Sequence, residues 1–334
     1  MEALSAASRA LRRAAIVGLA IVCSAVPLHA QAAAPAQSAA PARAMASAPT
    51  DTLDRRTLES VMGRTGAVLA GGVLRFGMPR ADLDVRIGEV RIRPTFALGS
   101  WLAFKAAPGG AVAMGDLVLL ESELGPVLAR LQSGGIEQSA IHHHLVGESP
   151  HVLYVHLHAH GEARRIAEAV RAALALTGTP TPPTAVAASG APANTPAAPT
   201  AFALDSAAIG NTIGFHGAVN GSVLQIGVPR TETIREMGLE IPATMGLATA
   251  INFQPTGDGK AAITGDFVLL AAEVNPVIRV LQSQGIAVTS LHNHLLDEEP
   301  RLFFMHFWAN DDALKLARGL RAALDVTNSR RPVR

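Results

Sequence analysis

The residues of this chain best suited to chemistry are its histidines, which are concentrated in two segments. Of the 12 histidines, seven fall between His142 and His160, and three more are His292, His294 and His306. Two imidazoles at positions i and i+2 of a strand share one face, and a third on the neighbouring strand can lie opposite them. Nitrogens placed about 2.0–2.1 Å from one ion in this way can hold zinc with an open fourth position. Iron, copper and nickel suit the same ligands.

Apolar residues orient the strands that carry the second group of histidines. In the run 302–309, every odd position from Phe303 to Ala309 is apolar. Alternate side chains of a strand face opposite sides of the sheet. The odd positions are therefore expected to pack against helices, and His306 to lie on the opposite face.

The preceding strand-like run, 287–295, has Leu291 and Leu295 at odd positions. If these leucines meet the same core, His292 and His294 share the face that carries the third histidine.

Opposed residues of an antiparallel pair lie on the same side of a sheet. We predict a register that pairs His292 with His306 and His294 with Phe304.

The first group repeats this arrangement, with His142 and His144 opposite His156, while His143 and Asn293 point the other way. An alternative is that the imidazoles hydrogen-bond within a semi-polar sheet face and hold no metal. The predicted metal ligands are three histidines from each group: His142, His144, His156, His292, His294 and His306.

Four carboxylates at matching positions of the two segments, Asp116 and Asp266 together with Glu123 and Glu273, could complete such sites. Glu123 and Glu273 are kept as additional candidate ligands. Helix capping or a surface ion pair is the simpler interpretation of all four residues.

Other polar and aromatic residues fit structural roles better than chemical ones. Trp308 and Phe304 lie on the histidine face, where packing against another β-layer is expected. Pro79-Arg80 and Pro229-Arg230 are typical of a turn followed by a surface arginine, rather than of an anion site. His216 has Gly66 at the matching position and is a weak candidate ligand.

The two histidine segments belong to an internal repeat with a constant offset of 150 residues. GDLVLLESELGPVLARLQSGGIEQSAIHHHLVGESP in the first half corresponds to GDFVLLAAEVNPVIRVLQSQGIAVTSLHNHLLDEEP in the second. A period this long indicates duplicated domains rather than a solenoid. We expect a first copy over 51–176 and a second over 201–328.

Local signals in the second copy give the order of its elements. Asn220-Gly221 predicts an early β-hairpin, and Asn275-Pro276 predicts a helix start that ends at Gly285 after a central strand. A hairpin and a leucine-rich helix over 311–324 follow. Strand, helix, hairpin, helix is a ferredoxin-like half with extra strands in front, so each copy is expected to be α+β with an antiparallel sheet.

The N-terminus has the layout of a secretory signal peptide over 1–30, with arginines, an apolar run and Leu28-His29-Ala30 as the cleavage end. The apolar run is shorter than the roughly 20 residues of a membrane span, so no span is expected after cleavage. The only cysteine, Cys23, is preceded by Ala20-Ile21-Val22, which disfavours a lipoprotein anchor. These features predict export, most simply to the periplasm.

Two Ala- and Pro-rich segments, 31–50 and 177–200, are predicted to be extended, disordered linkers. The chain has 28 basic and 27 acidic residues and no basic stripe beyond its N-terminus. We therefore do not expect it to bind nucleic acid. The commonest hydrolase, nucleotide-binding and dehydrogenase motifs are also missing.

The segments GDF, EVNPV, HNH and PRLFFMHFWA of the second copy resemble the LppY/LpqO family, bacterial domains of unknown function often found in exported or lipid-anchored proteins. The resemblance covers roughly 60–176 and 207–326, and the first copy departs from the pattern at His143, His151 and His158. It implies export and duplication but no reaction.

Three functions fit these observations. The first is an exported protein that binds a divalent transition metal or small ligand through its histidine hairpins. The second is a metal-assisted hydrolase or lyase with Glu273 or Asp266 as base. The third is a cell-envelope interaction module whose histidine faces are buried between the two copies, packed as an intramolecular pseudo-dimer.

Overall fold

The computed structural model describes residues 52–181 and 202–331. The predicted signal peptide with Cys23, the linker 31–50 and the linker 177–200 beyond its first five residues lie outside the described residues.

The first copy is an antiparallel sheet with three helices. Its elements follow in the order α1 (Arg55–Met62), β1 (Ala67–Leu69), β2 (Val73–Pro79), β3 (Arg86–Ile87), β4 (Val90–Arg91), β5 (Gly99–Ala107), β6 (Gly110–Leu120), α2 (Glu121–Ser133), β7 (Glu137–His142), β8 (Val152–Gly161) and α3 (Ala163–Leu174). The order of strands in its main sheet is β1-β2-β5-β6-β8-β7.

The second copy repeats this plan. Its elements are α4 (Ser206–Ile213), β9 (Ala218–Asn220), β10 (Val223–Pro229), β11 (Arg235–Glu236), β12 (Leu239–Glu240), the 3-10 helix η1 (Ala243–Met245), β13 (Ala248–Gly257), β14 (Lys260–Leu269), α5 (Ala271–Ser283), β15 (Ala287–His292), β16 (Glu298–Glu299), β17 (Phe303–Asp312) and α6 (Ala313–Asp325). Its main sheet has the order β15-β17-β14-β13-β10-β9. The predicted α+β class and the order strand, helix, hairpin, helix are confirmed.

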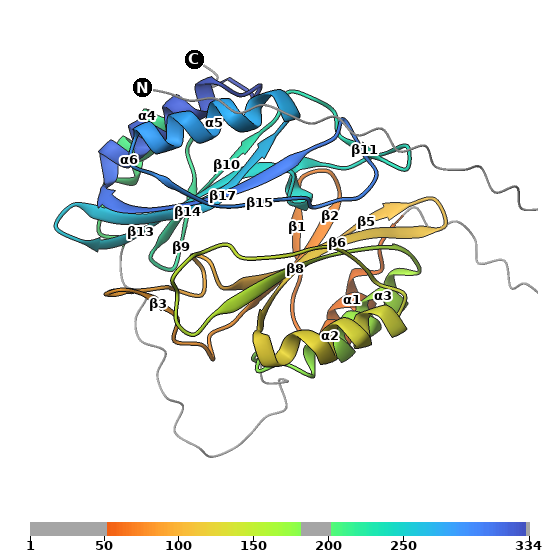
Figure 1. Cartoon of the computed structure of the whole chain (residues 1–334). Helices are drawn as coiled ribbons and strands as arrows, with labels where there is room; N and C mark the ends of the chain where they lie inside the picture. Colours follow the sequence, from red (N-terminus) through yellow and green to blue (C-terminus); the bar gives the residue numbers. More distant parts are fainter. Residues whose placement is uncertain (1–51, 182–201, 332–334) are drawn as a thin grey trace, which may run out of the picture. The chain divides into compact units, whose positions relative to one another are not determined.

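In each copy the helices cover one face of the sheet (Figure 1). Alternation along the strands explains which face this is. In β17, Met305, Phe307 and Ala309 join the core beneath the helices, as predicted, while Phe304 and His306 lie on the other side.

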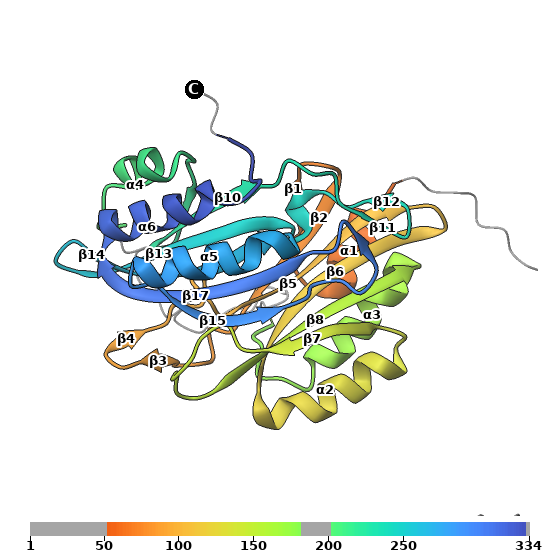
Figure 2. The ribbon, with the colours of Figure 1, turned by 45° about the horizontal axis from the view of Figure 1, so that its top comes forward.

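The helix-free faces of the two sheets pack against each other. One apolar cluster combines Val73 and Met114 of the first copy with Met245 and Phe304 of the second. Another combines Phe96 and Tyr154 of the first copy with residues of β10 and β14. Figure 2 shows the edge strand β15 of the second copy beside β7 of the first. Because both clusters draw on both copies, each copy shields the apolar face of the other from water.

The predicted hairpin register is wrong by two residues. His292 pairs with Phe304, and Ser290 rather than His292 pairs with His306. A bulge between Val288 and Ser290 also changes the register by one residue within β15. Beyond the bulge, a shift of two residues leaves the strand's side chains on their predicted faces. Before the bulge the facing is reversed, so Val288 packs against the core under the helices. Leu295, predicted in that core, lies instead in the apolar cluster between the copies. His294 lies just beyond the end of the strand.

Two further local predictions need correction. Helix α5 begins at Ala271 rather than at Pro276, because Glu273 accepts a hydrogen bond from the Leu270 amide and satisfies the first turn. Its end at Gly285, which has a φ of 73°, is as predicted. Leu291 is 48% exposed because β15 is an edge strand.

Gly265 in β14 permits the close approach of β13 at the centre of the second sheet. A Cβ at this position would lie 1.9 Å from the Ala250 carbonyl oxygen, whereas a Cβ on Gly227 in β10 would meet nothing within 4 Å. We expect Gly265→Ala to lower the free energy of unfolding by at least about 2 kcal/mol. Gly227→Ala is the control and should leave it within about 0.5 kcal/mol. Urea unfolding followed by circular dichroism measures both, and equal midpoints for the two variants would contradict the account.

Candidate metal centre

The six predicted histidines come together in one cluster, the histidine centre, which is built from both copies: His142, His144, His156, His292, His294 and His306. The rings of His142 and His292 stack with centroids 3.7 Å apart. Nε2 of His156 lies 3.2 Å from Nε2 of His292. The sequence predicted two triads of histidines, and the docking of the copies merges them into a single centre.

The edge strands β7 and β15 hold the two halves of the centre together by a reciprocal pair of hydrogen bonds. The Ser139 hydroxyl donates to the His294 carbonyl oxygen, and the Thr289 hydroxyl donates to the His144 carbonyl oxygen at 2.7 Å. Ser139 and Thr289 occupy the bulges of their strands. The bulges that shift the register thus also join the copies.

The imidazoles are close enough to share ions. Ligand nitrogens lie within 4.8 Å of one another in three overlapping groups: His142, His144 and His156; His142, His292 and His306; and His156, His292 and His294. Two nitrogens bound to one tetrahedral zinc ion are about 3.3 Å apart, close to the His156–His292 separation of 3.2 Å. Two of the three groups contain ligands from both copies.

Backbone carbonyls orient the rings from behind. Nδ1 of His306 lies 2.7 Å from the Gly265 carbonyl oxygen, and Nδ1 of His294 lies 3.2 Å from that of Gly246. A proton on Nδ1 donated to a carbonyl leaves the Nε2 lone pair free, which is the usual arrangement of metal-binding histidines. His156 makes the same contact with Gly115 at 3.4 Å.

Among the described residues, several nitrogens that face the centre form no hydrogen bond, although Nε2 of His144 and of His294 lie near the carboxylates of Asp116 and Asp266. Hydrogen-bond partners are missing for both nitrogens of His142, for Nδ1 of His292 and for Nε2 of His144, His294 and His306. Burial lowers the pKa of every histidine in the centre, that of His294 to about 3. Neutral imidazoles with unused lone pairs are the form that binds metal ions.

Asp116 and Asp266 are buried beside the histidines. Oδ2 of Asp266 lies 3.0 Å from Nε2 of His294, and Oδ2 of Asp116 lies 3.4 Å from Nε2 of His144. Burial raises the pKa of Asp266 to about 6. Burial, followed by the charge of Asp266, raises the pKa of Asp116. A cation bound at the centre would offset this cost of burying two carboxylates.

Aromatic rings border the centre. Phe304 stacks on His294 at 3.5 Å and Tyr154 on His144 at 3.4 Å. Trp308 packs edge-on against Phe96 of the first copy. The predicted packing of Phe304 and Trp308 against another β-layer is confirmed, and that layer is the sheet of the other copy.

A cavity of about 730 Å³ opens onto one side of the centre. Its walls include both aspartates and four of the histidines: Asp116, Asp266, His144, His156, His294 and His306. A volume of this size is typical of a small-molecule site. The metal-binding groups are therefore accessible to a ligand through the cavity.

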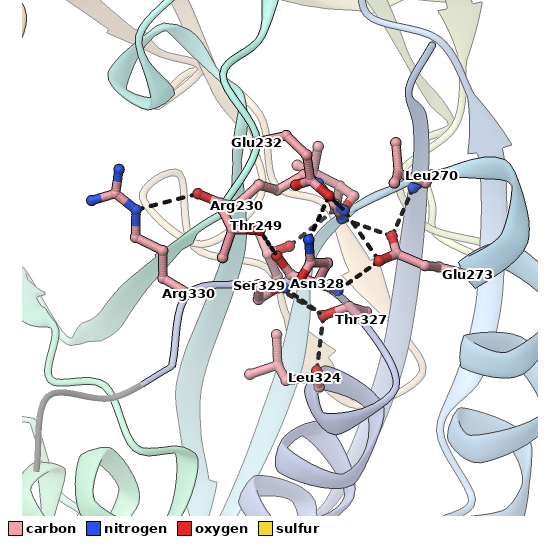
Figure 3. A network of polar contacts seen from close by, with 12 residues as sticks. Arg230, Glu232, Thr249, Leu270, Glu273, Leu324, Thr327, Asn328, Ser329 and Arg330 are labelled. Atoms are coloured by element: carbon pink, nitrogen blue, oxygen red, sulfur yellow. Dashed lines mark hydrogen bonds and ion pairs between the residues drawn. The ribbon is translucent and has the colours of Figure 1, made fainter. Parts of the chain in front are cut away.

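Glu123 and Glu273, the additional candidate ligands, lie in a different network. Glu273 forms an ion pair with Arg230 at 2.7 Å, and its carboxylate also accepts from the amides of Leu270 and Asn328 (Figure 3). Glu123 and Arg80 repeat this arrangement in the first copy. Both carboxylates are structural in these contacts, in line with the capping role favoured by the sequence.

The two arginines of this network correct an expectation from the sequence. Arg80 is 0% exposed and Arg230 3% exposed, not surface residues after a turn. Each is buried because its guanidinium also donates to a backbone carbonyl, of Val118 or Val268, at the end of a central strand. The sequence signal was the matching 43-residue spacing between arginine and glutamate in both copies.

His158 forms a smaller cross-copy contact outside the histidine centre. Its Nε2 lies 2.6 Å from Glu236 of the second copy, and its Nδ1 lies 3.6 Å from Glu137. Burial lowers the pKa of His158, but the two carboxylates outweigh it and raise the pKa above its ordinary value. His143 and His216 are exposed and belong to none of the metal-binding groups among the described residues.

The fold and the site together define a duplicated α+β protein whose two copies share histidine groups able to hold a metal ion. Segments 56–176 and 207–326 match the family model described as Domain of Unknown Function (DUF1259). The two segments make up more than half of the chain, which therefore belongs to this family. No curated protein and no solved structure matches the chain.

The match confirms a tandem domain of unknown function, whereas the LppY/LpqO name remains a prediction. None of the helices in the described ranges is long and apolar enough to cross a membrane.

The buried network of Figure 3 should contribute much more stability than a surface ion pair. Glu273→Gln removes one negatively charged partner of the buried Arg230. We therefore expect a loss of about 3 kcal/mol in the free energy of unfolding. The control is Glu168→Gln, which breaks an exposed pair with Arg164 and should cost less than about 0.5 kcal/mol. Equal midpoints of the two variants in denaturant unfolding would contradict the structural role of the Arg230–Glu273 pair.

Acid should destabilise the metal-free protein through the histidine centre. The pKa of each histidine of the histidine centre is lowered on folding. Below about pH 6.5 the unfolded chain therefore binds more protons than the folded one, and stability decreases as the pH falls. Asp266, with its pKa raised to about 6, has the opposite effect as pH falls from about 6 to 3.8, but the histidines are more numerous.

The measurement is the urea midpoint of chelator-treated protein at about pH 7.5 and 5.5, a range that spans the unfolded histidine pKa. The double variant His142→Leu, His292→Leu should lose less stability between these values. A wild-type midpoint that does not change would contradict the prediction.

Proposed function

We propose that the protein binds a divalent transition-metal ion, zinc in the first instance, at the histidine centre between its two copies. The observation that carries the proposal is the convergence of six imidazoles, four buried and two half-buried, five of which have a nitrogen with no hydrogen bond among the described residues. Such nitrogens are costly to bury unless a ligand satisfies them. Iron, copper and nickel accept the same donor set.

Two of the three histidine groups need both copies. The groups that combine His292 with His142 or His156 exist only when the two sheets are docked. A metal ion bound there would also stabilise the docked state, since a ligand that binds only the folded form raises its stability. The N-terminal signal supports placing this activity outside the cytoplasm, in the periplasm, with a cleaved leader rather than a lipid anchor.

The cavity favours a metal-assisted hydrolase or lyase as a second candidate function. Asp266 and Asp116 line the cavity beside the histidines, where a carboxylate can act as base toward a metal-activated water or substrate. Glu273, the alternative base suggested by the sequence, is held by Arg230 instead. The third hypothesis, an interaction module, uses the same docked faces without a metal.

Elemental analysis of protein purified without a histidine tag tests the metal proposal. We expect near-stoichiometric metal in the wild type and its loss in a variant with alanine at His142, His144, His292 and His294. The control is His143→Ala, His151→Ala, which removes two imidazoles outside the metal-binding groups and should retain the metal.

Zinc should also raise the melting temperature of the wild type and the control, but not that of the fourfold variant. At a free metal concentration 100 times the Kd the stabilisation is about 2.7 kcal/mol. Failure to bind any metal after loading with zinc and dialysis would overturn the proposal and leave the interaction module.

A further inference from the structure

One end of the cavity carries a positive charge with no protein partner. Arg75 of β2 lines the cavity and lies over the ring of Trp101, with its guanidinium carbon 4.3 Å from the ring centroid. It forms no ion pair or hydrogen bond within the described part of the chain, and the charge of Asp116 only partly offsets the lowering of its pKa by burial. Guanidinium groups held away from water usually pair with a carboxylate or phosphate.

Arg75 is connected to the histidine centre by direct contacts. The Trp101 ring reaches Gly246 of the second copy so closely that a Cβ there would lie 2.8 Å from its edge. The Gly246 carbonyl oxygen in turn contacts Nδ1 of His294 at 3.2 Å. Arg75 therefore lies one aromatic ring and one peptide unit away from the candidate metal ligands.

The second copy provides an internal comparison. The residue that matches Arg75 is Gln225, which also lines the cavity and donates to the Thr95 carbonyl oxygen at 2.8 Å. The residue opposite Asp266 is Ala250, whereas Trp101 lies opposite Asp116. A neutral side chain is thus sufficient for the fold at this position, and the arginine with its tryptophan is a feature of one end of the cavity alone.

We infer that the Arg75 end of the cavity binds the carboxylate of a small organic acid whose apolar body extends along the cavity toward the histidine centre. One guanidinium matches one carboxylate in charge and in its two-pronged geometry. The remaining wall near it is largely apolar, with Leu69 and Trp101. This ligand class belongs to the same site as the proposed metal ion, so the inference rests on the proposed function.

Phosphate fits this end of the cavity less well. Its second negative charge would have no further arginine or lysine among the cavity-lining residues. Asp116 and Asp266 on the cavity wall would repel it more strongly than they would a monoanion. The ligand chemistry that the cavity favours is therefore a singly charged carboxylate.

Calorimetric titration with benzoate and hexanoate, each beside its neutral amide and beside inorganic phosphate, tests the inference on the full chain. At least one of the two acids should bind the wild type at least tenfold more tightly than its amide and more tightly than phosphate. Binding should quench the fluorescence of Trp101. Arg75→Gln, which installs the residue of the second copy, should weaken binding of the acid at least tenfold and leave binding of the amide unchanged.

The titrations are run on both zinc-loaded and chelator-treated protein, and metal content is measured separately. Carboxylate binding that depends on Arg75 without any bound metal would support this inference even if the metal proposal failed. Equal binding by wild type and Arg75→Gln, tighter binding of phosphate, or no binding of either acid would overturn it. Because a destabilised Arg75→Gln would complicate the comparison, Arg75→Lys is titrated as well and should bind the acid more weakly than wild type but more tightly than Arg75→Gln.

Discussion

Six imidazoles and two carboxylates share one buried contact between two sheets, and the rest of the structure is arranged around the cost of keeping them there. Burial strips these groups of water, which lowers the pKa of the histidines and raises that of Asp116 and Asp266. Apolar clusters on either side keep the faces together despite that cost. The polar groups can then be satisfied by backbone carbonyls behind them, by one another, as in the contact of His294 with Asp266, or by a ligand between them.

The contacts around the centre orient the histidines and leave room for a ligand. Gly265 brings its carbonyl to His306, and Gly246 brings its carbonyl to His294. Ser139 and Thr289 use strand bulges to tie each edge strand to the opposite copy. Further away, the buried Arg230 fixes the end of strand β14, the strand that carries Asp266. These contacts hold the inward nitrogens in place without occupying them.

Much of this centre could be predicted from alternation and repetition. The period of two along β17 correctly placed His306 opposite the helix-covered face, and the 150-residue offset transferred that result to His156. The faces of Leu291 and His292 were predicted correctly despite the error in register, because beyond the bulge the error was an even number of residues. Neither the bulge at Thr289 nor the end of β15 at His292 has a clear signal in the local sequence.

The features that could not be predicted depend on contacts between distant parts of the chain. Nothing in the histidine motifs indicates that the two groups meet, since the sequence offers three histidines to a site in each copy. The burial of Arg80 depends on Glu123 and on the Val118 carbonyl, which only the folded sheet brings together. Leu291 was expected in the core because its strand was not known to lie at the sheet edge.

The unequal ends of the cavity have a consequence that a symmetric homodimer could not achieve. Two identical chains would present the same group at both ends, so an elongated ligand could enter in either of two equivalent orientations. Here the copies are joined in one chain and have diverged to Arg75 at one end and Gln225 at the other. Because the two copies are fused, the two ends of the cavity differ. An elongated ligand can therefore bind in one orientation, with the same end always next to the central imidazoles.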